Sequence, residues 1–113
     1  MSGNPANIQI ALKKATTEMM VLHLLRQKPM YTYEMMNAIE ERSGGDITLN
    51  TLYLSIYRLE ENGYIREHEK VMSEDNRVRI YFAITDAGSA YFDELVKGYL
   101  RYTAALARVL ELD

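Results

Sequence analysis

The fold of this chain is decided by residues 48–68, which read TLNTLYLSIYRLEENGYIREH. Apolar side chains recur in the first part of this segment at spacings of three and four residues, at Leu49, Leu52, Ile56 and Leu59. This spacing predicts the buried face of a helix that begins at the candidate N-cap Thr48 and ends at Asn62-Gly63. The residues that follow, Tyr64 to His68, are β-prone, so the segment predicts a helix with a strand directly after it.

Two further helices are predicted on the N-terminal side of this segment. The first covers Ile8 to Arg26, which contains no Gly or Pro, and its apolar face consists of Ile8, Leu12, Ala15, Met19, Leu22 and Leu25. Thr32 is the candidate N-cap of the second helix, because its hydroxyl can accept from a free backbone N–H of the first turn. The inner face of that helix consists of Met35, Met36 and Ile39. Gly44-Gly45 ends it, since glycine readily adopts positive φ.

A β-hairpin is predicted on the C-terminal side of the deciding segment. Residues 77–84, RVRIYFAI, form a second and longer β-prone run, and the polar residues 70–76 suit the loop between the two runs. Three helices followed by two antiparallel strands define a winged helix-turn-helix. The predicted fold is therefore mainly α-helical with a small β-hairpin, the wing, and the winged-helix domain covers residues 8–84.

The last predicted helix covers residues 85–112. Thr85 is its candidate N-cap, and Asp86 lies in the first turn, where a carboxylate is favoured by the positive helix end. Its apolar stripe consists of Phe92, Leu95, Tyr99, Tyr102, Leu106 and Val109. We expect this stripe to dimerise the chain and to pack with the first helix, so that both regions form one structural unit. The candidates for the dimer interface, which can also line an effector pocket, are Ile8, Leu12, Ala15, Met19, Phe92, Leu95, Tyr99 and Tyr102.

The composition is that of one globular domain. The chain has 113 residues, of which 48% are hydrophobic and 26% are charged. It has no cysteine, which excludes disulfides and a Cys-rich zinc site, and we expect neither a metal nor a cofactor. The first residues lack the basic cluster and apolar run of a signal peptide, and no apolar stretch approaches the ~20 residues that span a bilayer. We therefore expect a cytoplasmic protein that does not associate with a membrane.

The charge balance counts against a nucleic-acid partner at first sight. The net charge is −3, whereas phosphate contacts rely on Lys and Arg. The acidic residues are concentrated, however, because residues 60–76 hold six of them against two Lys or Arg. Residues 1–59 hold five acidic residues against six Lys or Arg, so the predicted helices before the wing are not acidic.

Candidate DNA contacts lie on the face of the third helix opposite its apolar stripe. Amide and hydroxyl groups there can meet base edges or phosphates, and they belong to Thr48, Asn50, Thr51, Ser55 and Tyr57. Two interpretations of Tyr53 stay open, and both predict that it packs against the domain. In one it also offers its hydroxyl to a phosphate, and in the other it serves only in the core.

Basic residues in three predicted elements are candidate phosphate ligands. Arg77 and Arg79 are two residues apart, which places both on one face of a strand; the alternative is a solvated strand. Arg58 either meets a phosphate or pairs with the carboxylates around Glu61. Lys13 and Lys14 of the first helix either lie beside the DNA backbone or belong to a solvated face.

Four blocks, in order, resemble the PadR family of transcriptional regulators. Residues 31–34, YTYE, are similar to the family's YGYE, and residues 51–53 with 58–65, TLY and RLEENGYI, are similar to GTLYP and RLExxGxI. Residues 77–82, RVRIYF, resemble RPRKYY, and residues 84–88, ITDAG, resemble LTxxG. The resemblance runs from about Leu12 to about Tyr99. Leu54 and Val78 replace prolines of the family pattern, and Ile80 replaces a frequent basic residue, which reduces the charge of the wing.

The resemblance implies a dimeric winged-helix repressor that is released from DNA by a hydrophobic or aromatic effector. The chain is most similar to the smaller members of the family, which have a single long helix after the wing. The implied partners are double-stranded DNA with a pseudo-palindromic operator and a second copy of the chain. The implied effector site lies near the dimer centre, between the first and last helices.

Two other functions stay open from the residues alone. A winged-helix domain can bind a protein instead of DNA, which the acidic balance favours. A dimer can bind small molecules and have only weak DNA binding, which the nine tyrosines and seven methionines favour. An enzyme is not expected, because His23 and His68 lie in different predicted elements and the sequence has no cysteine and no Gly-rich phosphate loop.

Overall fold

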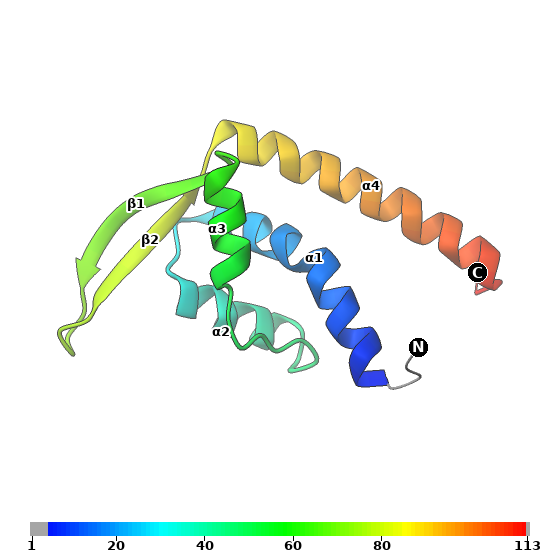
Figure 1. Cartoon of the computed structure of the whole chain (residues 1–113), viewed down its shortest axis with the longest axis horizontal. Coiled ribbons are helices and arrows are strands. Elements are labelled where there is room, and N and C mark those ends of the chain that lie inside the picture. The colour runs from blue at the N-terminus through cyan, green and yellow to red at the C-terminus, as the bar shows by residue number, and fades with distance from the viewer. Residues whose placement is uncertain (1–4, 113) are drawn as a thin grey trace.

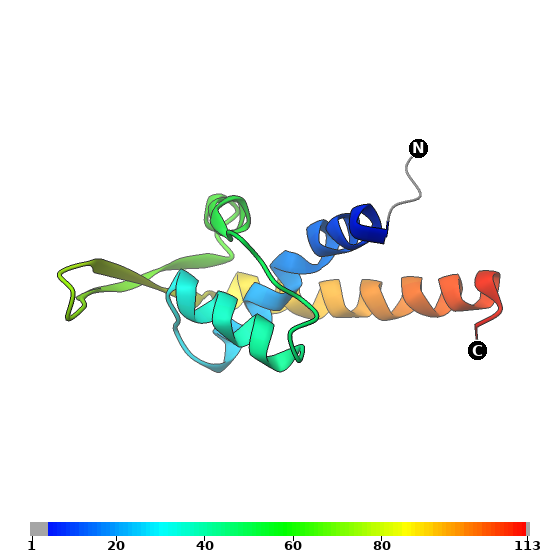
Figure 2. The ribbon, with the colours of Figure 1, turned by 90° about the horizontal axis from the view of Figure 1, so that it is seen from below.

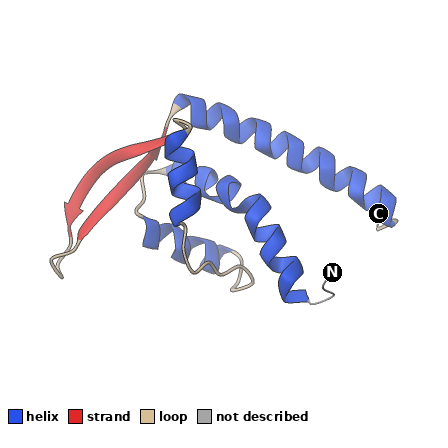
Figure 3. Ribbon diagram, in the orientation of Figure 1, coloured by secondary structure: helices blue, strands red, loops and turns tan. Residues whose placement is uncertain are grey.

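The computed structural model of the chain describes residues 5–112, with side chains from Ile10 onward. Four helices and one antiparallel hairpin follow one another in the order α1 (Pro5–Gln27), α2 (Thr32–Arg42), α3 (Tyr53–Glu61), β1 (Ile65–Met72), β2 (Val78–Ile84) and α4 (Asp86–Leu110). Figure 1 shows α1, α2 and α3 gathered at the centre, with the wing and the far end of α4 extending in opposite directions. The two strands of the described chain pair with each other in this hairpin, which is red in Figure 3.

One apolar core joins the three central helices to the base of the wing. The predicted buried faces of α2 and α3 are confirmed in the main, because Met35, Ile39, Leu52, Ile56 and Leu59 are buried. The second half of α1 is buried on nearly all sides, through Val21, Leu22, Leu24 and Leu25. The first half of α1 differs, since Leu12 and Ala15 are exposed. Ile8 lies outside the residues whose side chains are described.

The start of α2 corrects the predicted cap. Thr32 is the first helical residue and Tyr31 is the N-cap, and among the described residues no side chain caps this helix. The Met35 amide instead donates to the Tyr31 carbonyl at 3.1 Å. The predicted end is confirmed, because Gly44 and Gly45 follow α2 with φ of 66° and 87°, which glycine adopts without strain.

The start of α3 is also later than predicted. The helix begins at Tyr53, with Leu52 as its N-cap, and not after Thr48. The chain leaves α2 in a loop in which the Ile47 amide donates to the Ser43 hydroxyl at 2.9 Å. Thr48, Asn50 and Thr51 therefore belong to the loop before the helix. In this loop the Thr51 hydroxyl accepts from the Tyr53 amide at 3.1 Å.

The wing is longer in its first strand than the sequence predicts. Strand β1 extends to Met72 and pairs with β2 from Ile65↔Ile84 to Met72↔Val78, with an irregularity between Glu67 and Glu69. The predicted loop over residues 70–76 is thus reduced to a turn after Met72. In that turn the Ser73 amide donates to the Arg77 carbonyl at 2.8 Å, and Asn76 adopts a φ of 61°. Arg77 consequently lies in the turn and not in the strand.

A main-chain bridge fastens the base of the wing to the loop between α1 and α2. The Met30 amide donates to the Phe82 carbonyl at 3.1 Å, and the Phe82 amide donates back to the Met30 carbonyl at 2.9 Å. Both side chains are buried. The wing therefore has a fixed direction relative to α2 and α3.

The start of α4 is fastened to the end of α3, and the predicted cap Thr85 is confirmed. The Thr85 hydroxyl accepts from the Gly88 amide at 3.0 Å and donates to the Gly63 carbonyl at 2.7 Å. The Thr85 amide donates to the Tyr64 carbonyl at 3.1 Å. The rings of Tyr64 and Tyr91 stack with centroids 4.2 Å apart.

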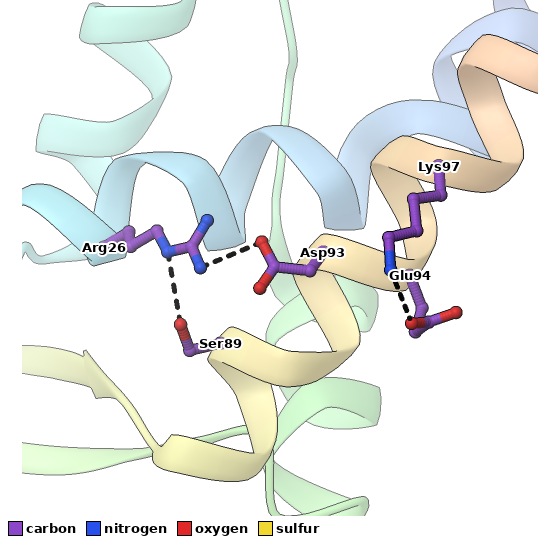
Figure 4. A network of polar contacts seen from close by, with 5 residues as sticks. All are labelled: Arg26, Ser89, Asp93, Glu94 and Lys97. Carbon is purple, nitrogen blue, oxygen red and sulfur yellow. Dashed lines mark hydrogen bonds and ion pairs between the residues drawn. The ribbon is translucent and has the colours of Figure 1, made fainter.

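Helices α1 and α4 contact each other at one end only. Arg26 forms an ion pair with Asp93 at 2.9 Å and a hydrogen bond with Ser89 at 3.2 Å (Figure 4). Its guanidinium also lies 4.9 Å from the centroid of the Phe92 ring. Beyond this contact the two helices diverge toward their far ends (Figure 1). The predicted stripe of α4 is therefore divided, because Phe92 and Leu95 pack against the chain's own core whereas Tyr99 and Tyr102 are exposed.

Candidate nucleic-acid interface

The exposed surface of α3 has two flanks. Tyr53 and Tyr57 are one turn apart and face the wing, whereas Leu54 and Arg58, also one turn apart, face α1. The side chains of Tyr53, Leu54 and Tyr57 are exposed. The helix thus presents a surface of aromatic and hydrogen-bonding groups that has room for another molecule on both sides.

Two candidates on α3 are placed otherwise than predicted. Ser55 is only 7% exposed and lies against α1, so its hydroxyl is not available at the free surface. Tyr53 is 75% exposed, which rules out both interpretations that pack it against the domain. Tyr57 lies on the exposed side as predicted. The hydroxyl groups on the free surface of α3 therefore belong to tyrosines and not to Ser55.

The loop that precedes α3 adds the remaining polar candidates. Thr48, Asn50 and Thr51 are all exposed, and they line a hollow of the surface next to α1. Their position before the first turn of the helix suits contact with phosphates or base edges, because amide and hydroxyl groups can both donate and accept. These three residues are therefore exposed beside α3, although in a loop, and their contact with DNA stays a prediction.

A groove of about 570 Å³ separates α3 from the wing. Four tyrosines line it, two from the start of α2 and two from α3, and with Phe82 the aromatic lining is Tyr31, Tyr33, Tyr53, Tyr57 and Phe82. Tyr31 and Tyr33 were not among the predicted site residues. The YTYE block at residues 31–34 contains both tyrosines, but in the sequence it indicated only the start of a helix and a resemblance to the family.

Arg79 supplies the positive charge of this groove. Its guanidinium lies 4.7 Å from the centroid of the Tyr31 ring, and Tyr31 in turn meets Tyr81 edge to face at 5.2 Å. This stacking holds the guanidinium at the groove while its N–H groups stay available to an anion. Arg79 is therefore accessible to an anion in the groove, and its role as a phosphate ligand stays a prediction.

Arg77 is less favourably placed than Arg79. It lies in the wing turn and is paired with Asp75 at 3.5 Å. The Ser73 hydroxyl, which donates to this carboxylate, holds the pKa of Asp75 below its usual value, so that the acid stays ionised. Arg77 thus precedes the strand that contains Arg79, and the charge of Arg79 also acts on Asp75.

Carboxylates limit where an anion can bind in the groove. Glu60 and Glu67 line it together, and desolvation and then the charge of Glu67 raise the pKa of Glu60. Exposed acidic side chains continue along β1 at Glu67 and Glu69. A phosphate is consequently favoured near Arg79 and disfavoured near the carboxylates of Glu60 and Glu67.

Arg58 makes an ion pair that neither of its predicted roles included. Its Nε lies 3.1 Å from Oε2 of Glu18, which joins α3 to α1. The expected pairing with carboxylates around Glu61 is wrong, since Glu18 is 40 residues away in sequence. The side chain of Arg58 remains about half exposed, so its other N–H groups face the surface.

A second hollow, of about 590 Å³, lies between α1, the end of α2 and α4. It contains three of the predicted interface residues, Met19, Phe92 and Tyr99, together with Met20 and Val96. Leu12, Ala15, Leu95 and Tyr102 do not line it. The hollow is mainly apolar and opens where α1 and α4 diverge.

The structure and the family comparison agree on the class of protein. Three helices, a hairpin and a long last helix constitute a winged helix-turn-helix domain with a C-terminal extension. A profile of the transcriptional regulator PadR-like family matches residues 21–94. The chain therefore belongs to the PadR-like family of transcriptional regulators, which are DNA-binding proteins and not enzymes.

Solved structures and one curated relative extend this likeness. A PadR family transcriptional regulator from Eggerthella lenta DSM 2243 is 27% identical, with a TM-score of 0.80 over 96% of this chain and 93% of that chain. A transcriptional regulator from Clostridium thermocellum shares the fold at 24% identity and a TM-score of 0.76, over 87% and 96% of the two chains. An uncharacterised protein of Lysinibacillus sphaericus is 34% identical over 79 residues, which are 68% of this chain and 72% of that protein. The predicted fold and family are thus confirmed.

None of the helices within residues 5–112 is long and apolar enough to cross a bilayer.

Proposed function

We propose that this protein is a cytoplasmic, homodimeric repressor that binds a pseudo-palindromic operator. The observation that carries the proposal is the free surface of α3, which is rich in hydrogen-bonding groups and stands beside a groove containing Arg79. A helix with such a surface fits the major groove, and the wing then lies along the adjacent strand. Thr48, Asn50, Thr51 and Tyr57 contact base edges or phosphates in this arrangement.

The exposed apolar surface of α4 supports dimerisation. Large apolar side chains remain exposed along its second half, at Tyr99, Leu100, Tyr102, Leu106, Val109 and Leu110. Leu12 of α1 is exposed as well. A continuous surface of this kind is more than a monomer normally leaves in water. A second copy that packs against it places two α3 helices on one side of DNA, about 34 Å apart in successive major grooves.

The hollow between α1 and α4 supports an effector. Its volume of about 590 Å³ is in the range of small-molecule sites, and its lining is mainly apolar with His23 and Arg42 at the edge. It adjoins the surface proposed for dimerisation. A planar hydrophobic or aromatic compound bound there changes the angle between the two helices and so the spacing of the two α3 helices.

Arg79→Gln is expected to weaken DNA binding by roughly tenfold on any duplex, because the change removes a phosphate contact and not a base contact. The slope of log K against log salt should become shallower by about 0.9. Fluorescence anisotropy with a duplex from the protein's own promoter and with a scrambled duplex measures both quantities. Sedimentation in the same buffer shows whether the binding species is a dimer.

Lys97→Gln is the matched control for Arg79. Lys97 lies on α4 and pairs with Glu94 at 3.5 Å, away from the groove (Figure 4). Its loss should leave the affinity and the salt slope unchanged. If the wild-type protein binds neither duplex at low salt, the proposed function is wrong.

Val96→Phe is expected to reduce effector binding at least tenfold, since the larger side chain fills part of the hollow. Binding of planar aromatic compounds to the wild-type protein should raise its melting temperature and release the promoter duplex. Thermal unfolding and anisotropy with a panel of such compounds test both effects. Val71→Phe, the same change on the wing, should leave ligand binding intact. A panel that shifts neither melting nor DNA release would contradict the effector.

The exposed carboxylates of β1 favour one alternative, a protein-interaction module. Glu67 and Glu69 give the wing an acidic surface that suits a basic partner better than DNA. The anisotropy experiment decides between the two functions. Absence of DNA binding at low salt, together with retained folding and dimerisation, would favour the protein-interaction module.

A further inference from the structure

A hollow of about 350 Å³ lies on the flank of α3 that faces away from the wing. Its walls are the first half of α1, the loop before α3 and α3 itself. Apart from the buried Thr17 and Ser55, the polar groups in these walls belong to Lys13, Lys14, Thr48, Asn50, Thr51 and Arg58. The hollow therefore combines cations with amide and hydroxyl groups at the edge of the proposed interface.

The lysines in this hollow are free cations. Within residues 10–112 no carboxylate forms an ion pair with Lys13 or Lys14. None of the described residues that line the hollow is acidic. Glu18, which follows Thr17 of the lining, is paired with Arg58. The hollow thus differs from the groove on the wing side, which contains two carboxylates.

The lysines also lie on the side of α1 that faces α3. Ile10, Lys13, Lys14 and Thr17 are spaced by three and four residues and line this hollow. Thr16, Met19, Met20 and His23 have the same spacing on another side of the helix and line the hollow next to α4. A partner that packs on α4 therefore leaves the lysine side of α1 uncovered.

The first half of α1 and α3 lie toward the same side of the molecule. Figure 2 shows α3 nearly end-on, with the first half of α1 rising on the side of α3 opposite the wing. A helix in the major groove has one sugar-phosphate strand along each flank, because the groove is about 12 Å wide and a helix with its side chains nearly fills it. The wing flank has Arg79 for one of these strands.

We propose that Lys13 and Lys14 bind the phosphates of the other strand, which borders the major groove on the flank away from the wing. Arg58 helps to complete this contact while Glu18 holds its guanidinium in place. The inference rests on the proposed DNA binding and extends the interface to α1. It also explains how a chain of net charge −3 binds DNA, since Lys13 and Lys14 lie beside α3 and the carboxylates of Glu60 and Glu67 lie on its opposite flank.

The experiment compares the double variant Lys13→Gln/Lys14→Gln with the wild-type dimer. The variant should bind both the promoter duplex and the scrambled duplex roughly tenfold more weakly or worse, and its salt slope should be shallower by about 1.8, or about 0.9 for each lost phosphate contact. Lys13→Arg/Lys14→Arg should retain the affinity and the slope. Lys97→Gln/Arg101→Gln on α4 removes two cations elsewhere and should change neither.

The outcomes separate this inference from the proposed function. If the wild-type protein binds DNA and the Gln variant keeps its affinity and slope, the inference is wrong and the proposed function stands. If the wild-type protein does not bind DNA, the proposed function itself fails. If the Gln variant loses helical circular dichroism or dimer mass along with its affinity, the lysines act in folding and the inference is again overturned.

Discussion

Replacement of Gly88 by alanine is expected to lower the free energy of unfolding by about 3 kcal/mol, an effect of overpacking at a rigid contact. A Cβ atom at this position would lie 2.0 Å from the Tyr64 carbonyl oxygen and 2.9 Å from Cγ1 of Ile84. The carbonyl has no freedom to move away, because it also accepts the hydrogen bond from the Thr85 amide. Thermal unfolding should show a midpoint lower by roughly 10 °C. The comparison is made at one protein concentration, since the midpoint of a dimer depends on it.

Gly98→Ala is the control for this prediction. Gly98 lies in the same helix, and no described atom outside its own helix turn lies within 4 Å of the position of an added Cβ. Alanine there should raise stability by about 0.5–1 kcal/mol through helix propensity alone. Equal effects of the two substitutions would show that the contact between Gly88 and Tyr64 is not rigid.

Leu59→Ala is expected to lower the free energy of unfolding by about 3 kcal/mol, within the usual range of about 2–5 kcal/mol for a buried leucine. Leu59 is 0% exposed and belongs to the core cluster that also contains Leu52 and Ile56. Truncation leaves a cavity beneath α3 that the surrounding helices fill only in part. Urea unfolding followed by circular dichroism measures the loss as a lower midpoint at unchanged slope.

Leu54→Ala is the control for Leu59→Ala, because it makes the same substitution in the same helix at an exposed position. Leu54 lies in the same helix but is 65% exposed. Its truncation should change stability by no more than about 0.5 kcal/mol. A loss at Leu54 comparable to that at Leu59 would mean that the exposed flank of α3 is covered in the protein as it exists in solution.

The fold was predictable from the sequence because its periodic patterns coincide with its buried surfaces. The order of three helices, a hairpin and a long last helix follows from the spacing of the apolar residues and the positions of Gly63 and Thr85. The start of α3 was not predictable in this way. Thr48 has the chemistry of an N-cap, but the loop after α2 is held by the Ser43 hydroxyl, so the helix begins only at Tyr53.

The error at Ser55 has a geometric origin. The buried positions of α3 are Ser55, Ile56 and Leu59, and together with the buried N-cap Leu52 they are spaced as one helix face. Ser55 was placed on the free face because its side chain is polar. In the structure it is a small residue at the place where α3 approaches α1, and Thr17 of α1 is buried in the same region.

Contacts between distant parts of the chain account for what else the sequence did not predict. The ion pair of Arg58 with Glu18 and the stacking of Arg79 on Tyr31 both join residues more than 35 positions apart. No local pattern encodes either contact. The extension of β1 to Met72 has the same cause, because a strand rich in Glu and Lys has weak β-propensity and forms through pairing with β2.

The close approach of Gly88 to Tyr64 also bears on which side chains of α4 can be exchanged without changing the orientation of the helix. The contact is made by main-chain atoms and is supported by Phe92, Asp93 and Leu95, so the direction in which α4 leaves the winged-helix domain does not depend on the exposed side chains from Tyr99 onward. Those side chains can be exchanged to alter a partner or a ligand while the orientation of the helix is preserved. One DNA-binding domain can thus be combined with many different C-terminal helices.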